Sequence, residues 1–359
     1  MINTPSKLEA IAEKIKRIEN NRERLAAFLK EIKYNVDISG GDVVEKRLCY
    51  PVKSCEEKFK VCATDGGVSQ NSYHGLDIIL VRAVSVIAEY KGSRLENIAY
   101  FPSAFPEAEI EIISDPFTDE EFVLKSSLLR MKKELSTTLL AIKKFSPHIV
   151  LLDGSIVPHP SSRPQKNSPI KSTYQEVLGL FKELYESSFI LAGCCEDSRG
   201  RKFCEIISEK ILSTIDSPLI PELKKILANT RDTTLLFNVL DAGERTCVFK
   251  YGETPVTKDL GEHGNNIYTF YIKTAQFDRP VRVDFYAKEK PERLAEKIAS
   301  ILLSLACNSA YGFPAPLIEA DLRAKLKESD AEIVHKYLVE KIGLVPSLFK
   351  LRREMRPFG

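Results

Sequence analysis

The sequence contains no apolar run long enough to cross a membrane. Its longest candidates, residues 78–87 and 189–195, are interrupted and fall well short of the roughly 18 apolar residues that a spanning helix needs. The N-terminal segment is charged and has none of the apolar core that a signal peptide carries. We therefore expect a protein that is not embedded in a membrane and that works in the reducing setting of the cytoplasm.

The cysteines lack the spacing of a structural zinc site. All eight are isolated from metal-binding patterns, because the sequence has no CxxC pair and no histidine at zinc-finger spacing. We expect most of them to be buried thiols. The net charge of +2, from 52 basic and 50 acidic residues, neither requires nor excludes a nucleic-acid partner. Any such function must be argued from local patterns.

A long amphipathic helix is predicted near the N-terminus. Apolar residues recur at positions 8, 11, 15, 18, 25, 29 and 32, at alternating intervals of three and four that only Arg22 interrupts. This stripe can pack on its own domain, or it can contact a second copy of the chain, since heptad spacing favours helix pairing. We expect a mixture of both.

Strands and one long helix are predicted in the first half of the chain. Residues 59–67 and 78–90 are predicted strands, and residues 99–113 form either another strand or a hairpin, so a three-stranded meander is the simplest interpretation. A helix over 118–145 begins with a capping-box pattern and stops before a proline. Residues 148–155 form a short apolar run that ends in an acid and a glycine, which is typical of a central buried strand.

The second half reads as a continuing α/β pattern. A loop over 157–173 carries Arg163, Lys166 and Lys171 directly after the central strand. Helix and strand then alternate, strand-like segments dominate 233–287, and helices are expected over 292–307 and from near Leu317. No repeat or clear linker is present, so we predict one mixed α/β domain at 46–330, an N-terminal helix at 1–45 that we expect to be a dimer contact, and a C-terminal helical tail at 331–359.

Three acids occupy positions that surface charges rarely take. Asp65 and Asp153 each follow an apolar run and precede glycine, so both are expected at strand ends, where they could share a site. Glu134 lies mid-helix beside the apolar stripe and can point inward at one edge. A single Asp-Gly pair is more often a turn than a ligand, and that interpretation stays open for Asp65 and for Asp153.

Clustered, buried carboxylates need a compensating cation. Leaving such charges unpaired costs several kcal/mol, and like charges repel one another. Mg²⁺ and Mn²⁺ prefer carboxylate oxygens, and two such ions about 3.5–4 Å apart can activate water and stabilise the leaving oxygen of a phosphodiester. The acids therefore favour a metal-dependent phosphodiesterase.

The order of these features resembles a known nuclease layout. A strand with Asp65, a meander, a helix with Glu134, a strand with Asp153 and a late acid resemble the RNase H-like arrangement. More narrowly, the sequence resembles the NurA nuclease family of archaea and some bacteria. Short motifs carry this likeness in order from about residue 60 to 325, at 64–67 (TDGG), 130–134, 151–155 (LLDGS), 196–199 (EDSR), 231–236 and 311–321.

The resemblance implies a fold, an activity and partners. It implies an RNase H-like mixed central sheet flanked by helices, and a toroidal homodimer that works with the hexameric HerA ATPase in DNA-end resection and repair. It also implies Mn²⁺-dependent 5′–3′ exonuclease and single-strand endonuclease activity, supported by two Mn²⁺ ions or by Mg²⁺. Asp65, Glu134 and Asp153 carry over by position as metal ligands.

The late motif departs from the family pattern. The family usually has a Tyr-Pro pair followed by a histidine, whereas this sequence has Phe313-Pro314 and Asp321. Aspartate is a competent ligand for a hard metal ion, so we expect Asp321 to complete the site, but Phe313 cannot supply a hydroxyl. Glu196 also stands where the family often has lysine, so a basic contact is missing there.

Basic residues are candidates for phosphate contacts. These are Arg163, Lys166 and Lys171 in the loop, Arg199 beside Asp197, and Arg130, which either contacts phosphate or neutralises Glu134 one helical turn away. Two other functions remain open: a non-catalytic DNA clamp or scaffold of the same fold, and an RNA-cleaving enzyme, since the sequence does not separate DNA from RNA.

Overall fold

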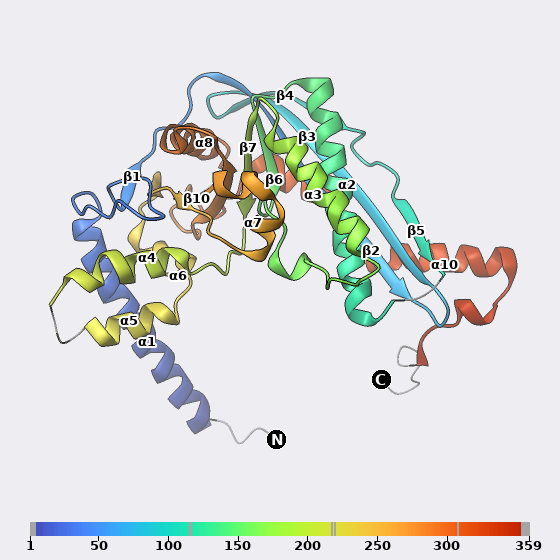
Figure 1. Ribbon diagram of the computed structural model, residues 1–359, viewed down its shortest axis with the longest axis horizontal. Coiled ribbons are helices and arrows are strands. Elements are labelled where there is room, and N and C mark those ends of the chain that lie inside the picture. The colour runs from blue at the N-terminus through green and yellow to red at the C-terminus, as the bar shows by residue number, and fades with distance from the viewer. Residues whose placement is uncertain (1–4, 115–116, 217, 219, 307–308, 353–359) are drawn as a thin grey trace. The chain divides into compact units, whose positions relative to one another are not determined.

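The computed structural model describes residues 5–114, 117–216, 218, 220–306 and 309–352 (Figure 1). The contacts between its residues group the chain into two compact units. Unit 1 comprises residues 1–55, 194–252 and 266–314, and unit 2 comprises residues 56–193, 253–265 and 315–359. Each unit gathers segments that are distant in sequence. This grouping therefore cuts the chain at places other than the predicted boundaries after residues 45 and 330, and residues 1–4 and 353–359 of the predicted terminal segments lie outside the described residues.

Unit 1 begins with α1 (Pro5–Ile32), the predicted amphipathic helix. The C-terminal half of its stripe is buried in the core of unit 1, where Leu25 and Leu29 are at most 2% exposed. The N-terminal half is different, because Leu8, Ile11 and Ile15 are 58%, 52% and 55% exposed. The structure thus confirms that part of the stripe packs on its own domain.

The rest of unit 1 combines helices with strands that pair antiparallel to one another. The strand order is β1-β8-β10-β11, and β9 also pairs with β10. The strands are β1 (Cys49–Pro51), β8 (Glu244–Thr246), β9 (Phe249–Lys250), β10 (Ile267–Lys273) and β11 (Val281–Tyr286), and the helices are α4 (Lys202–Lys210), α5 (Ile220–Ala228), α6 (Asp232–Val239) and α8 (Pro291–Ser304).

Two sequence predictions for this region need correction. The sequence predicts that strands dominate residues 233–287, but this stretch begins in α6. The prediction is wrong there because a short apolar run such as residues 235–240 does not distinguish a buried helix from a buried strand. The same stretch also contains the short helix α7 (Pro255–Asp259), which belongs to unit 2. The helix predicted over 292–307 ends at Ser304, and residue 307 lies outside the described residues.

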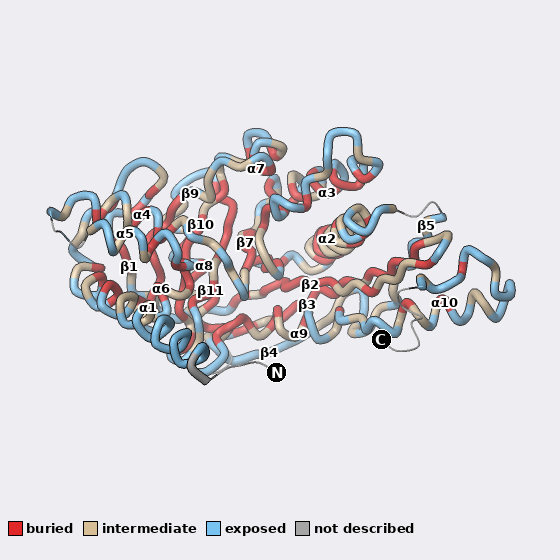
Figure 2. The backbone as a smooth tube through the Cα atoms, turned by 90° about the horizontal axis from the view of Figure 1, so that it is seen from below, coloured by how far each residue is buried: buried red, intermediate tan, exposed pale blue. Residues whose placement is uncertain are grey.

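Unit 2 is built on a mixed sheet with helices on both faces, which is the predicted α/β fold class. The strand order is β7-β6-β2-β3-β4, and β5 also pairs with β3. In Figure 2, α2 and α3 lie on one side of β2 and β3, and α9 and α10 lie on the other. The strands are β2 (Lys58–Ser72), β3 (Asp77–Lys91), β4 (Arg94–Phe101), β5 (Glu109–Ile113), β6 (Ile149–Asp153) and β7 (Ile190–Cys195), of which β7 crosses the boundary with unit 1.

The helices of unit 2 follow the sequence signals closely. α2 (Asp119–Phe145) starts after Thr118, whose hydroxyl accepts a hydrogen bond from the Glu121 amide at 3.3 Å, and it ends at Phe145, with Ser146 as its C-cap just before Pro147. The predicted meander is present, with residues 94–113 divided into β4 and β5. The remaining helices are α3 (Lys171–Tyr185), α9 (Ala315–Ala324) and α10 (Glu328–Ile342), and 3-10 turns occupy Pro160–Ser162, Leu212–Thr214, Gly261–Asn266 and Pro346–Leu348 in the two units.

In the part of the chain that the structure describes, no helix has an apolar stretch long enough to span a bilayer.

Candidate active site

The site of interest lies where β2 changes its neighbours. β6 runs parallel to β2 and pairs with it from Val61↔Ile149 to Thr64↔Leu152, whereas β3 stays paired with β2 as far as Ser72. Asp153 ends β6, as the sequence predicts, and Gly154 turns the chain away with a φ of +90°. Asp65 is the first β2 residue beyond the β6 pairing. We call this stretch of β2, from Asp65 to Val68, the open edge.

Asp65 is not at the end of its strand, contrary to the sequence prediction. β2 continues for seven residues beyond it, paired with β3 throughout. The Gly66-Gly67 pair that suggested a turn is extended backbone inside the strand. Side chains on a strand alternate between faces, and each glycine admits a close neighbour on one face of the sheet.

Glu134 approaches the open edge from the α2 face. A Cβ added to Gly66 would lie 2.6 Å from both Cγ and Oε1 of Glu134, so this position tolerates no side chain while Glu134 stays in place. The Glu134 side chain is 12% exposed. The prediction that this mid-helix acid points inward at one edge is confirmed.

Asp321 approaches from the opposite face, on α9. A Cβ added to Gly67 would lie 2.1 Å from the carbonyl oxygen of Ala324, the last residue of that helix. The helix packs on β3 through Ala320 and Ala324. Its Asp321 side chain is exposed and interacts electrostatically with Asp65. The two faces of the sheet therefore both deliver a carboxylate to the open edge.

The electrostatics show that these acids form one cluster. Burial raises the pKa of Asp65 to about 6, and repulsion by Asp321 adds to this rise, whereas the Gly66 amide and Arg130 oppose it. Burial also raises the pKa of Glu134 to about 8, with further repulsion from Asp65 and Asp153 and an opposing effect of Arg130. Each carboxylate is repelled by at least one other. The raised pKa values of Asp65 and Glu134 reflect the cost of gathering negative charge away from water.

Arg130 is paired with the two buried acids. Its Nη1 lies 3.0 Å from Glu134 Oε1 and 3.9 Å from Asp65 Oδ1, and it donates a hydrogen bond to the Gly66 carbonyl at 3.3 Å. Attraction to Glu134 raises the pKa of Arg130. Of the two roles predicted for Arg130, neutralisation of Glu134 is thus present in the structure.

The donor set suits a hard divalent cation. Glu134 Oε1 is buried and accepts no hydrogen bond, because the Arg130 N–H groups do not point at it, and such an oxygen can serve a metal ion. Among the described residues, no three acidic, histidine or cysteine side chains already stand in coordinating geometry. Arg130 lies against two of the acids and the other two extend towards solvent, so a metal ion would draw them together.

Comparison with known proteins supports the family resemblance. The model of the NurA domain matches residues 59–326. The chain belongs to the NurA domain family. This match confirms the resemblance predicted between about residues 60 and 325, and it spans the segments that carry Asp65, Glu134, Asp153 and Asp321. No curated protein matches the sequence.

Solved NurA structures share the fold of this NurA domain protein. The NurA nuclease from Sulfolobus solfataricus superimposes with a TM-score of 0.57 at 19% identity, over 100% of both chains. A structure of NurA bound to dAMP and manganese has a TM-score of 0.59 at 11% identity, over 97% of this chain and 99% of that one. A structure of NurA with manganese gives 0.56 at 11% identity, over 94% and 98%. The likeness shows a common fold and confirms the predicted fold class.

The predicted phosphate contacts of this NurA domain are partly engaged elsewhere. Arg163 pairs with Asp259 through two hydrogen bonds, of 2.7 and 3.2 Å, and Tyr174 donates a third to the same carboxylate at 2.9 Å. Lys166 and Lys171 are exposed, and Lys171 opens α3. The predicted loop over 157–173 is therefore anchored through Arg163, its last three residues belong to α3, and its lysines are exposed to solvent.

The remaining predicted residues belong to unit 1. Asp197 pairs with Arg279 at 2.7 Å, and Arg199 is exposed in the turn after β7. Glu196 accepts a hydrogen bond from the Tyr311 hydroxyl, two residues before Phe313. Phe313 itself is buried at 4% exposure, which suits its lack of a hydroxyl.

One residue near the site was not predicted from the sequence. Arg82 lies opposite Gly67 on β3 and donates hydrogen bonds to the carbonyl of Ala324, the last residue of α9, and to that of Lys325 directly after it. The sequence does single it out, because Arg82 is the only charged residue in the apolar run over 78–88. A charge at this half-buried strand position is stabilised by a partner, and here the partner is a helix end.

Proposed function

We propose that this chain is a metal-dependent nuclease that hydrolyses DNA phosphodiester bonds. The observation that carries the proposal is the convergence of four acids on the open edge of β2, from both faces of the sheet and from the end of β6. These are Asp65, Glu134, Asp153 and Asp321. Manganese is present in two of the similar NurA structures, one of which also holds dAMP.

The four carboxylates would hold one or two Mn²⁺ or Mg²⁺ ions. Such ions supply a nucleophilic water at neutral pH and neutralise charge on the leaving oxygen. Asp65 fixes the position of the set, because it is buried on a strand that is paired along its whole length with β3. Glu134 contributes an oxygen that accepts no other hydrogen bond. Arg130 limits repulsion between these two acids and stands beside them as a donor for a phosphate oxygen.

Exposed basic residues would guide a DNA strand towards the four acids. Lys166 and Lys171 lie on the segment that follows Asp153, so they are candidates for contacts that read no base sequence. Arg163 would act by anchoring this segment to Asp259. Arg199 remains a candidate phosphate contact on unit 1.

The finer activity and the partners follow from family membership. We infer 5′–3′ exonuclease and single-strand endonuclease activity in DNA-end resection and repair, in the cytoplasm and together with a HerA-like hexameric ATPase. Membership of the NurA domain family supports this reading. It also supports a homodimer, for which the exposed half of α1 provides an apolar face.

The dimer proposal is tested by changing only that exposed face. Replacing Leu8, Ile11 and Ile15 by serine leaves the buried Leu25 and Leu29 in place, so unit 1 keeps its core. Light scattering should then report monomers. Persistent dimers would place the interface elsewhere.

The nuclease proposal is tested by incubating purified protein with end-labelled single-stranded DNA or RNA, with Mn²⁺, Mg²⁺ or a chelator. DNA should be cut only with metal. Asp65→Ala and Asp153→Ala should lower the rate by about a thousandfold, because loss of a metal ligand removes several kcal/mol of transition-state stabilisation. Cleavage of RNA alone would indicate an RNA-cleaving enzyme, and metal-independent DNA binding without cleavage would indicate a clamp.

A further inference from the structure

The helix that carries Asp321 ends directly on the strand that carries Asp65. The Ala324 carbonyl of α9 fills the space above Gly67 where a side chain would stand. Gly67 is paired with Arg82 on β3, and residues directly opposite each other on neighbouring strands project to the same face. Arg82 therefore lies beside the end of α9.

Arg82 caps that helix end. Its Nε donates to the Ala324 carbonyl at 3.2 Å, and its Nη2 donates to the Lys325 carbonyl. The last carbonyls of a helix have no partner within the helix, and they carry a partial negative charge. A guanidinium at this position satisfies two of them and complements the charge.

The capped turn is the same turn that presents Asp321. The Lys325 amide donates to the Asp321 carbonyl at 2.9 Å, so the carboxylate and the capped end belong to one turn of backbone. The start of α10 is tied to the same strand, because Ser69 accepts a hydrogen bond from the Ala331 amide at 3.2 Å. The distance between Asp321 and Asp65 thus depends on how firmly this end is held.

We propose that Arg82 is a positioning residue for the metal site, which acts by clamping the C-terminal turn of α9 onto Gly67 so that Asp321 faces Asp65. This inference rests on the proposed function. Arg82 touches the helix carbonyls and not the carboxylates, so its effect should pass entirely through Asp321.

The test measures Mn²⁺ affinity of the full chain by following free Mn²⁺ with electron paramagnetic resonance during titration. Arg82→Met keeps most of the apolar stem and removes every donor. It should weaken Mn²⁺ binding about ten- to a hundredfold, as loss of a residue that orients a ligand does. The double variant Arg82→Met/Asp321→Ala should bind no more weakly than Asp321→Ala alone, since both remove the same ligand. Arg82→Lys retains the charge and should recover part of the affinity.

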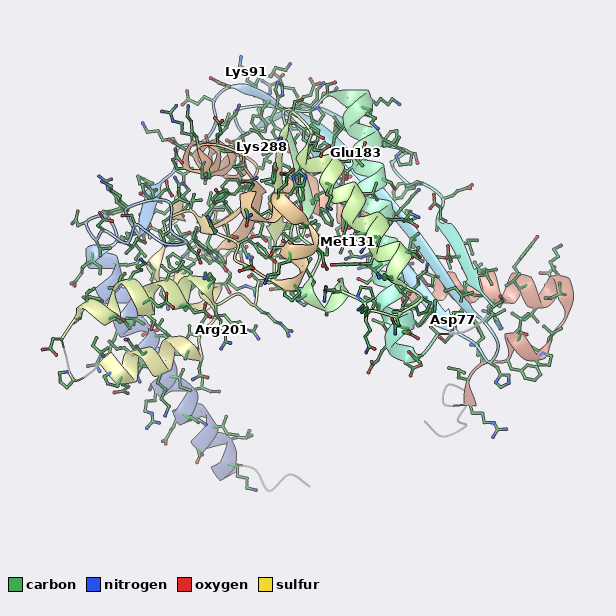
Figure 3. All side chains as sticks on the ribbon, in the orientation of Figure 1. Asp77, Lys91, Met131, Glu183, Arg201 and Lys288 are labelled. Carbon is green, nitrogen blue, oxygen red and sulfur yellow. The ribbon has the colours of Figure 1, made fainter. Side chains whose placement is uncertain are left out.

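Unit 1 offers a matched control. Arg201 donates from Nη1 to the carbonyl of Ala228, the last residue of α5, at 2.6 Å, and Figure 3 labels it on that unit. Arg201→Met also removes a helix-end cap but belongs to a different unit from the four acids. It should lower the melting temperature as Arg82→Met does while Mn²⁺ affinity stays at the wild-type value.

The outcomes separate this inference from the proposed function. If Asp321→Ala weakens Mn²⁺ binding and Arg82→Met does not, the positioning role is wrong and the metal site stands. The same conclusion follows if the effects of the two substitutions add, because Arg82 would then act by another route. If neither Asp65→Ala nor Asp321→Ala changes Mn²⁺ affinity, the proposed metal site itself is wrong.

Discussion

The Glu134 side chain lies across the backbone of Gly66, so closely that a Cβ there would meet its Cγ and Oε1 at 2.6 Å. Gly66→Ala should therefore displace Glu134 without removing its charge. We expect cleavage to fall about a hundredfold, the effect that a misplacement of about 1 Å can have on a catalytic group. Steady-state rates with labelled DNA and saturating Mn²⁺ measure this.

A second glycine provides the control for that substitution. Gly179 is exposed on α3, and a Cβ there would meet nothing within 4 Å. Gly179→Ala should leave activity unchanged and stabilise the helix by roughly 0.5–1 kcal/mol. An active Gly66→Ala variant would mean that Glu134 is not needed where the structure places it.

Stability without metal should depend on pH through Glu134. Its pKa is about 8 in the folded chain, against an ordinary value of 4.5. Between these values the folded protein holds a proton that the unfolded chain has released, so the free energy of unfolding falls as the pH rises from about 4.5 to about 8. Asp65 adds a smaller change of the same sign, because its pKa is about 6.

Glu134→Gln removes the ionisation and should remove most of that fall. In chelator, the variant should melt at least about 2–4 °C above the wild type at pH 9, which corresponds to roughly 1 kcal/mol. Near pH 4 the two proteins should melt together. A difference in melting temperature between the two proteins that stays the same at every pH would show that ionisation of Glu134 does not cause the fall in stability.

Asp321 should influence which metal ion supports cleavage. With Asp321 the cluster has a formal charge of −4, which two divalent ions balance, and a histidine would reduce it to −3. Asp321→His should weaken support by Mg²⁺ more than support by Mn²⁺, because imidazole suits the softer ion better. Asp321→Asn keeps the shape, loses the charge and should lower activity sharply with both ions. Unchanged rates for Asp321→Asn would leave a site of three carboxylates.

The basic loop over 157–173 should contribute to DNA binding mainly through its two exposed lysines, Lys166 and Lys171. Lys166→Gln and Lys171→Gln should each reduce the slope of log K against log salt by about 0.7 for single-stranded DNA if each side chain contacts one phosphate. Arg163→Gln should change the slope less, because its charge is already paired with Asp259. Filter binding at several salt concentrations tests this, and an unchanged slope in the lysine variants would make the loop a connection only.

Local signals in the sequence predicted where two of the candidate residues lie in the fold. Asp153 and Gly154 were found because a strand end has a local signature, an apolar run followed by an acid and a glycine that turns the chain. Glu134 was found because helical periodicity fixes which side of α2 it occupies. These inferences needed only neighbours in sequence.

Non-local packing set the limits of prediction. In the sequence, Gly66 and Gly67 suggest a turn. Glycine is needed at these positions because α2 and α9 approach the strand closely from opposite faces, and neither helix is close to them in sequence. Arg82, a charged residue in an apolar strand, was not predicted to belong near the site, because its partner lies more than 240 positions away in the sequence. The grouping into two units has the same origin, since each unit assembles three separate stretches of chain.

The central claim is that these acids bind metal at the open edge of β2. Crystals soaked in Mn²⁺ and measured at an anomalous X-ray wavelength test it most directly. The account predicts one or two anomalous peaks in contact with the carboxylates of Asp65, Glu134, Asp153 and Asp321. Manganese bound at other residues, with Arg130 still paired to Glu134 and no peak beside Asp65, would contradict it.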